Sequence, residues 1–263
     1  MIKKQSIFNL ILFVVILLAI LAVLGYWRVQ RDAAVLPVSN LETEDLVLGN
    51  SYETKAISES TDYVTVNVKY PYFPQASKEF NDQVETVLKK AIDEQKQSSE
   101  DNWKARYDTR APGDDIKAKP ETDEDKWPFM ADFTVAQSNA NYISFVEEYS
   151  GFSGGAHGYA NKVSFAYDVK NNKIMTLKDL FPNDPNYLKT VSDASRADLK
   201  KQYVVMNDGE DTSSLVSMIE DGTEPKEENF SVFTFTPTTI TLYFGQYQVG
   251  PYVLGMPEVQ LTR

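Results

Sequence analysis

The stretch WPFMADFTVAQSNANYISFVEEYSGFSGGAHGYANKVSFAYDV, residues 127–169, decides the fold class. It contains three strand candidates in succession, at 127–138, 141–149 and 163–169. Apolar side chains recur at every second position from Phe129 to Val135, which is the period of a half-buried strand. A glycine-rich loop, SGFSGGAHGY, lies between the second and third candidates, where a turn would reverse the chain. The stretch predicts an antiparallel sheet.

Helices and further strands lie on both sides of this stretch. YVTVNVKY at 63–70 has valine at every second position and predicts a strand. An apolar stripe at spacings of three and four predicts a helix over 77–98, with Ser77 as its N-cap. The remaining predicted elements are a short strand and helical turn at 174–181, helices at 186–206 and 211–220, and strands at 230–235, 239–244, 247–255 and 257–261. Because strands and helices are segregated rather than alternating, we expect an α+β fold.

The N-terminal segment is unlike the rest of the chain. Residues 7–27, IFNLILFVVILLAILAVLGYW, are 21 residues without a charge, which span roughly 30 Å as a helix. The segment is longer than a signal-peptide core and ends in GYWRVQR rather than a small-residue cleavage site. It predicts a transmembrane signal anchor within 1–28, a tether at 29–50, and an extracytoplasmic part formed by the remainder.

Composition excludes several classes of site. The chain has no cysteine and one histidine, so disulfides, thiol catalysis and any metal site that needs two histidines are excluded. Its net charge is −12, and since residues 1–31 carry +4, residues 32–263 carry −16. Such acidity disfavours nucleic acid and attracts cationic proteins, unless it serves solubility alone. The acidic run at 121–125 lacks the pattern of a calcium loop, so 99–126 is interpreted as a solvated insertion and no metal or other cofactor is expected.

Two segments hold candidate site residues. His157 lies between glycines in SGGAHGY. Three roles are open for it: a general base, a lone metal ligand, or a structural histidine that fixes the turn. Glu147 and Glu148 are adjacent on a predicted strand, so they face opposite sides and form no acid–base pair. The segment YFGQYQVGPYVLG at 243–255 is either an aromatic contact surface or strand-edge core packing. The candidate binding residues are His157, Tyr159, Tyr247, Pro251 and Tyr252; no catalytic residue is assigned.

Two family resemblances follow from quoted motifs. SGGAHGY, SFAYDVKNNKIMTLKDLF and YFGQYQVGPYVLG, in that order, resemble the extracytoplasmic domain of RsiV-type anti-sigma factors. VTVNVKYPYF with the helix at 77–98 resembles the module that precedes the catalytic domain in PdaC-type peptidoglycan deacetylases. The resemblances imply a PdaC-accessory-like part at 51–150 and an RsiV C-terminal-like part at 151–263, together one compact binding unit without catalysis. RsiV-type domains bind lysozyme, which makes a cationic protein of that kind an expected partner.

The chain departs from both families. Only six residues precede its apolar span, which leaves no room for a sigma-binding domain, and its one histidine does not supply a deacetylase metal site. We therefore expect a membrane-anchored extracytoplasmic binding module at the cell envelope. Its expected ligand is a wall glycan or a cationic protein such as lysozyme, and its membrane contact is residues 7–27. The alternatives are an envelope hydrolase or deacetylase centred on His157, and a purely structural protein.

Overall fold

The computed structural model describes residues 51–204 and 212–263, which lie in one compact unit, Leu48–Arg263. The predicted anchor at 7–27 and tether at 29–50 lie outside the described residues. Within 51–204 and 212–263, no helix is both long enough and apolar enough to cross a membrane.

The first sheet has six strands in the order β1-β2-β3-β4-β5-β6. The strands are β1 (Glu53–Ser60), β2 (Val64–Tyr72), β3 (Trp127–Ser138), β4 (Tyr142–Gly151), β5 (Tyr159–Asp168) and β6 (Lys173–Ile174). Neighbours pair antiparallel except β2 and β3, which pair in parallel. The expectation of an antiparallel sheet is therefore wrong for this one pairing, because the chain leaves β2, crosses over through a long helix and re-enters the sheet in the same direction. The mixed α+β fold is as expected.

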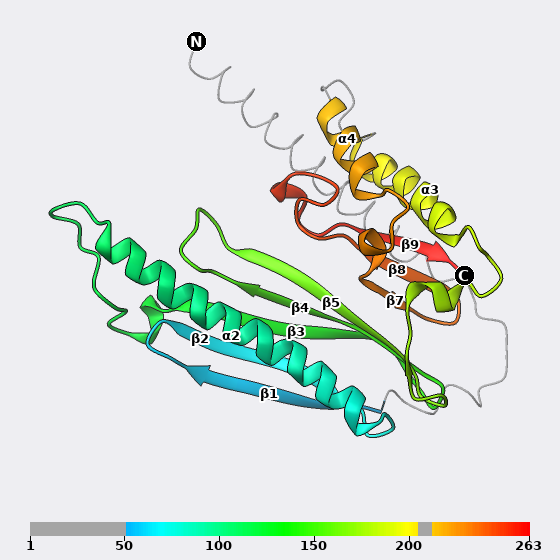
Figure 1. Ribbon diagram of the computed structural model, residues 1–263, viewed down its shortest axis with the longest axis horizontal. Helices are drawn as coiled ribbons and strands as arrows, with labels where there is room; N and C mark the ends of the chain where they lie inside the picture. The colour runs from blue at the N-terminus through cyan, green and yellow to red at the C-terminus, as the bar shows by residue number, and fades with distance from the viewer. Residues whose placement is uncertain (1–50, 205–211) are drawn as a thin grey trace, which may run out of the picture. The chain divides into compact units, whose positions relative to one another are not determined.

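Helix α2 (Lys78–Asp108) makes that crossover and covers one face of the sheet (Figure 1). It begins where predicted, since the Ser77 side chain accepts a hydrogen bond from the Phe80 backbone N–H. Its apolar stripe is fully buried with the inward side chains of the strands, and consists of Phe80, Val84, Leu88 and Ile92. The helix continues ten residues beyond the predicted end at 98, because Ser99 and Trp103 extend the buried stripe.

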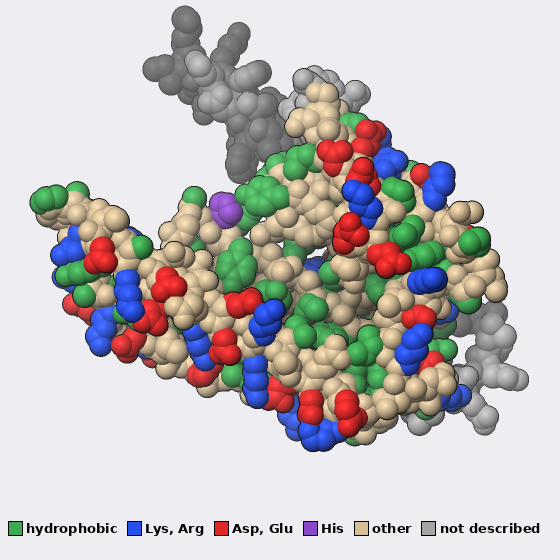
Figure 2. All heavy atoms as spheres, in the orientation of Figure 1, with side chains coloured by type: hydrophobic (Ala, Val, Ile, Leu, Met, Phe, Trp, Pro, Cys, Tyr) green, Lys and Arg blue, Asp and Glu red, His purple; other side chains and the backbone are tan. Residues whose placement is uncertain are grey.

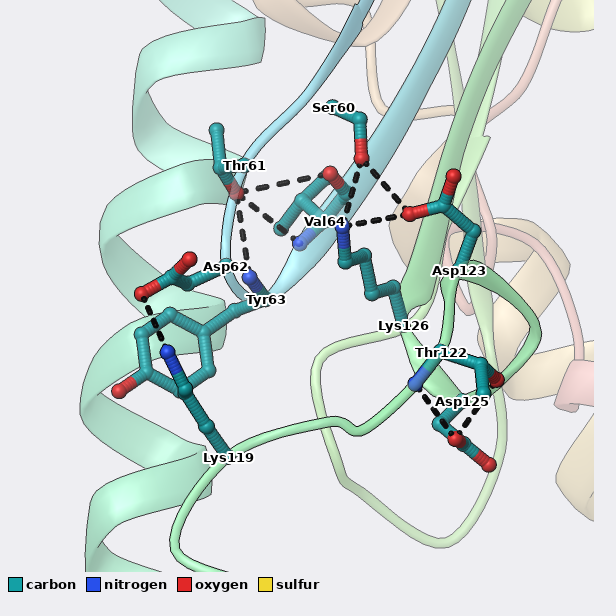
Figure 3. A network of polar contacts seen from close by, with 10 residues as sticks. All are labelled: Ser60, Thr61, Asp62, Tyr63, Val64, Lys119, Thr122, Asp123, Asp125 and Lys126. Carbon is teal, nitrogen blue, oxygen red and sulfur yellow. Dashed lines mark hydrogen bonds and ion pairs between the residues drawn. The ribbon is translucent and has the colours of Figure 1, made fainter.

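The segment after α2 is tied to the sheet rather than freely solvated, as Figure 3 shows. The indole N–H of Trp103 donates to the Lys117 carbonyl at 3.1 Å. Lys126 pairs with Asp123 at 2.5 Å and donates to the Ser60 hydroxyl at 2.8 Å, which joins a short 3-10 helix (Asp123–Asp125) to the end of β1. The interpretation of 99–126 as a solvated insertion is therefore wrong at both of its ends.

The second sheet has three antiparallel strands, β7 (Phe233–Phe235), β8 (Thr239–Tyr243) and β9 (Glu258–Thr262). Figure 1 shows α3 (Tyr187–Leu199) and α4 (Ser213–Gly222) on the side of this sheet away from β4 and β5. A π-helical turn (Lys200–Val204) follows α3, and 3-10 helices lie at Leu177–Leu180, Glu227–Phe230 and Tyr252–Leu254. The predicted strand at 247–255 is wrong, since that segment forms turns and the last of these short helices.

Serine hydroxyls connect the two sheets. The hydroxyl of Ser144 in β4 accepts from the Phe235 N–H at 2.9 Å, and that of Ser164 in β5 accepts from the Phe233 N–H at 2.8 Å. Strand β7 therefore lies on the face of β4 and β5 opposite α2. The second core cluster, which includes Val191, Ile219 and Val259, packs behind it.

Candidate functional site

Three aromatic side chains meet where the glycine-rich loop between β4 and β5 approaches the loop after β8. The His157 ring stacks on Tyr252 with centroids 3.9 Å apart, and Tyr247 lies 5.8 Å from Tyr252. The Nε2 atom of His157 lies 3.2 Å from the Tyr247 hydroxyl. We call His157, Tyr247 and Tyr252 the aromatic triad. Two of its members face solvent, since His157 is exposed and Tyr247 is 52% exposed.

Hydrogen bonds to one carbonyl hold the triad in place. Both the His157 Nδ1–H, at 2.8 Å, and the Tyr252 hydroxyl, at 3.0 Å, donate to the Gly158 carbonyl oxygen. The Gln246 side chain accepts from the Ala160 N–H at 3.1 Å, which fixes the C-terminal loop against the start of β5. The triad is thus assembled before any ligand arrives, which lowers the entropy cost of binding.

The glycine-rich loop is fixed on its other side by α2 and β3. Gln95 donates to the Phe152 carbonyl at 2.7 Å and accepts from the Tyr159 hydroxyl at 2.6 Å. Burial raises the pKa of Tyr159 to about 12, so its hydroxyl stays protonated and keeps this bond. Gly154 has φ +90°, and a Cβ there would lie 2.4 Å from the Trp127 ring. Glycine is therefore required at Gly154 for both its backbone angle and its space.

The structure brings together three of the five residues singled out by sequence. Tyr159 is half-buried and hydrogen-bonded to α2, so it supports the loop rather than the exposed surface. Pro251 is exposed and caps the short helix that carries Tyr252. Val253, on the same helix, is 84% exposed and was not singled out; its only sequence signal was its place in the aromatic segment.

The partners of the His157 ring are two neutral groups. Its two ring nitrogens contact a peptide carbonyl and a tyrosine hydroxyl, and no carboxylate is within hydrogen-bond distance of them in the described chain. Across 51–204 and 212–263, no group of three His, Cys, Asp or Glu side chains is placed to hold a metal ion. Figure 2 shows the single histidine, in purple, beside apolar side chains on the face in view.

A buried carboxyl lies elsewhere in the sheet. Glu147 and Glu148 face opposite sides of β4 as expected, but Glu147 is 0% exposed and neither of its oxygens has a hydrogen-bond partner. Burial raises the pKa of Glu147 to about 8, with the Asp132 carboxylate as a smaller cause. Alternation along β4 places Glu147 on the α2 side with Phe145, in the first core. We assign it no role in the triad.

Two family models match this chain. Residues 57–160 match the family described as "Deacetylase PdaC", and residues 178–263 match "Protein of unknown function (DUF3298)". A curated relative, peptidoglycan-N-acetylmuramic acid deacetylase PdaC of Bacillus subtilis (strain 168), is 30% identical over 132 residues. The match covers 50% of this chain and 27% of that protein, so the chain corresponds to about a quarter of the relative's length. The likeness to PdaC-type proteins is confirmed, whereas the likeness to RsiV-type anti-sigma factors stays a prediction.

Two solved structures share the fold. A DUF3298 family protein from Pseudomonas aeruginosa PAO1 has a TM-score of 0.52 and 16% identity, over 82% of this chain and 92% of that one. A DUF3298 family member from Bacteroides fragilis NCTC 9343 has a TM-score of 0.51 and 16% identity, over 81% and 91% of the two chains. At this identity the likeness concerns the fold. Along this chain, the segment similar to the PdaC family model is followed by the segment similar to the DUF3298 family model.

Proposed function

We propose that residues 51–263 form a non-catalytic binding module at the cell envelope, outside the membrane, where residues 7–27 anchor the chain. Its ligand is a wall glycan, bound at the aromatic triad. The likeness to a deacetylase whose name specifies peptidoglycan supports this ligand class. The apolar, uncharged sequence of residues 7–27 supports the anchor.

The observation that carries the proposal is the exposed, pre-assembled set of rings. A pyranose ring presents a face of C–H groups that covers an aromatic ring well, while its hydroxyls need donors and acceptors at the rim. The triad offers the face of Tyr247, and the His157 and Tyr247 polar atoms lie at its edge. The triad therefore combines a stacking surface with polar groups that orient a sugar.

Support for a role without catalysis comes from the bonding of His157. Its Nδ1–H is committed to a backbone carbonyl, and its Nε2 faces a tyrosine hydroxyl instead of an acid that would tune it as a base. The triad is suited to contact, and the chemistry of a hydrolase would need a partner for His157 that these bonds do not supply.

Sedimentation with insoluble peptidoglycan tests the proposal. The full 263-residue chain, in a mild detergent, is expected to co-sediment with purified wall sacculi, and Tyr247→Ala and His157→Ala should each weaken retention by about tenfold. Because His157 is exposed, we expect its substitution to leave the melting temperature near that of the wild type. Tyr72→Ala is the matched control, since Tyr72 is an exposed tyrosine on β2, outside the triad.

The same experiment separates the glycan from a cationic protein. Lysozyme, presented without sacculi, is the second probe, because the acidic chain attracts cationic proteins. Retention of lysozyme at moderate salt without retention on sacculi would refute the glycan ligand and favour the protein. Equal retention of the wild type and Tyr247→Ala on sacculi would refute the triad as the site.

A further inference from the structure

A groove of about 880 Å³ lies on the face of the first sheet opposite α2. Figure 1 shows α2 across the other face of β2 and β3, so this face is left open beyond the reach of β7. One wall of the groove is formed by the second sheet, through Tyr243 of β8 and Glu258 of β9. The volume is within the range of sites for small ligands, about 300–1,000 Å³.

Four charged side chains cross the floor of the groove in one row. Asp132 of β3 pairs in register with Glu148 of β4, and Glu148 pairs with Lys162 of β5. Val68 of β2 pairs with Ala131 of β3, and these two strands are parallel. The next residues, Lys69 and Asp132, are therefore also neighbours, and Lys69 continues the row. All four line the groove. The row places positive charges at its ends and two carboxylates side by side in its middle.

The two ends of the row differ in whether their charged side chains have ion-pair partners. The Lys162 side chain is 11% exposed, lies 2.7 Å from Glu258 and 3.5 Å from Glu148, and sits 4.7 Å from the centre of the Tyr243 ring. Lys69 and Asp132 are both exposed, and in the described part of the chain neither has an opposite charge within 4.0 Å. Among the described residues, the Asp132 carboxylate accepts a hydrogen bond from the Phe133 N–H alone, at 2.9 Å.

We propose that this groove binds a short peptide through its two charged termini. The ammonium group lies between Asp132 and Glu148, and the carboxylate lies on Lys69. An ammonium group relieves the repulsion of two carboxylates placed directly opposite each other on neighbouring strands, a pairing that is otherwise unfavourable. Neighbouring strands are about 4.8 Å apart, so the point midway between β3 and β4 lies about 7 Å from β2, and an extended dipeptide spans at most about 7 Å.

The groove is separate from the aromatic triad. Beside the charged row, the floor includes the apolar side chain of Met130, which is 52% exposed. A small aliphatic side chain of the peptide would cover Met130. The proposal therefore goes beyond glycan binding at the triad, and the two fail or succeed independently.

Methyl NMR of the full chain tests the proposal. The protein is labelled with [13C-methyl]methionine in a mild detergent, and the Met130 resonance is assigned by its loss in Met130→Leu. The probes are alanyl-alanine, its N-acetylated form, its C-amidated form, and glucosamine as an ammonium without a carboxylate. Alanyl-alanine is expected to shift Met130 saturably, and each blocked form to bind about tenfold more weakly.

Charge variants give the sharper readout. Asp132→Asn should abolish the preference for a free amine while keeping that for a free carboxylate, and Lys69→Gln should do the reverse. Asp101→Asn, on exposed α2 surface, is the matched control, and Tyr252→Ala should leave the Met130 shifts unchanged. Equal binding of the blocked dipeptides, stronger binding of glucosamine than of alanyl-alanine, or no Met130 shift would each overturn the proposal.

Discussion

Replacing Glu147 by glutamine should flatten the dependence of stability on pH. In the folded chain the pKa of this carboxyl is raised to about 8 from the ordinary value of 4.5. Between pH 4.5 and 8 the unfolded chain has lost this proton and the folded chain still holds it, so stability falls as pH rises through that interval. At about 1.4 kcal/mol per pH unit, the wild type should lose about 3 kcal/mol by pH 7 and about 4 kcal/mol by pH 8, where the folded carboxyl is itself half ionised.

Glu147→Gln keeps the shape of the side chain and removes its ionisation. The glutamine amide lacks hydrogen-bond partners, as the protonated carboxyl does in the wild type, so the two proteins should have similar stability at pH 4.5. At pH 7 the variant should be more stable than the wild type by about 3 kcal/mol. Urea unfolding at a series of pH values, followed by the fluorescence of the buried Trp103 and Trp127, measures the difference.

Carboxyls with a lowered pKa affect stability below this interval. The carboxyls whose pKa is lowered by lysine or hydroxyl partners, such as Asp123 and Asp179, contribute stability that is lost only as pH falls below about 4. Glu148→Gln is the control, since that side chain is exposed on the other face of β4. If Glu147→Gln keeps the slope of the wild type between pH 4.5 and 8, the reasoning about the buried carboxyl is refuted.

Two further predictions concern glycines and are checked by thermal unfolding. Gly154→Ala should lower the free energy of unfolding by about 3 kcal/mol, because Gly154 has a positive φ and an added Cβ would meet Trp127. Gly155→Ala should change it by less than about 1 kcal/mol, since an added Cβ there would meet only a carbonyl oxygen, at 3.7 Å. Equal losses in the two variants would contradict this reasoning. Gly222→Ala should lower the free energy of unfolding by about 3 kcal/mol or prevent folding, because its Cβ would lie 2.0 Å from the Gln248 carbonyl oxygen. A melting temperature equal to that of the wild type would show instead that α4 and the loop of Gln248 separate easily.

Local patterns predicted the elements with a buried face. The period of two from Phe129 to Val135 and the N-cap at Ser77 each depend on nearby residues, and β3 and the start of α2 lie where expected. Strand β1 was not predicted, because only Ile57 in it is even half-buried and no alternation results. The segment at 247–255 has the composition of a strand, but the positive φ of Tyr247 and Gly255 turns the backbone away from one.

Features that depend on contacts between distant residues could not be predicted from the sequence. The parallel pairing of β2 with β3 depends on how the intervening chain returns to the sheet. The loops of His157 and Tyr247 were each singled out by composition, whereas their meeting depends on the packing of the second sheet.

The parallel pairing of β2 with β3 also sets the order in which the chain assembles. The β1–β2 ribbon and the β3–β4–β5 meander are closed by short turns, whereas the seam between them joins Val64 to Trp127 across the whole of α2. Closing a loop of that length has a large entropic cost, so we expect both ribbons to form before the seam does. Until then, β2 and β3 would present unpaired edges lined with apolar side chains, and these would be the sites at which nascent copies aggregate.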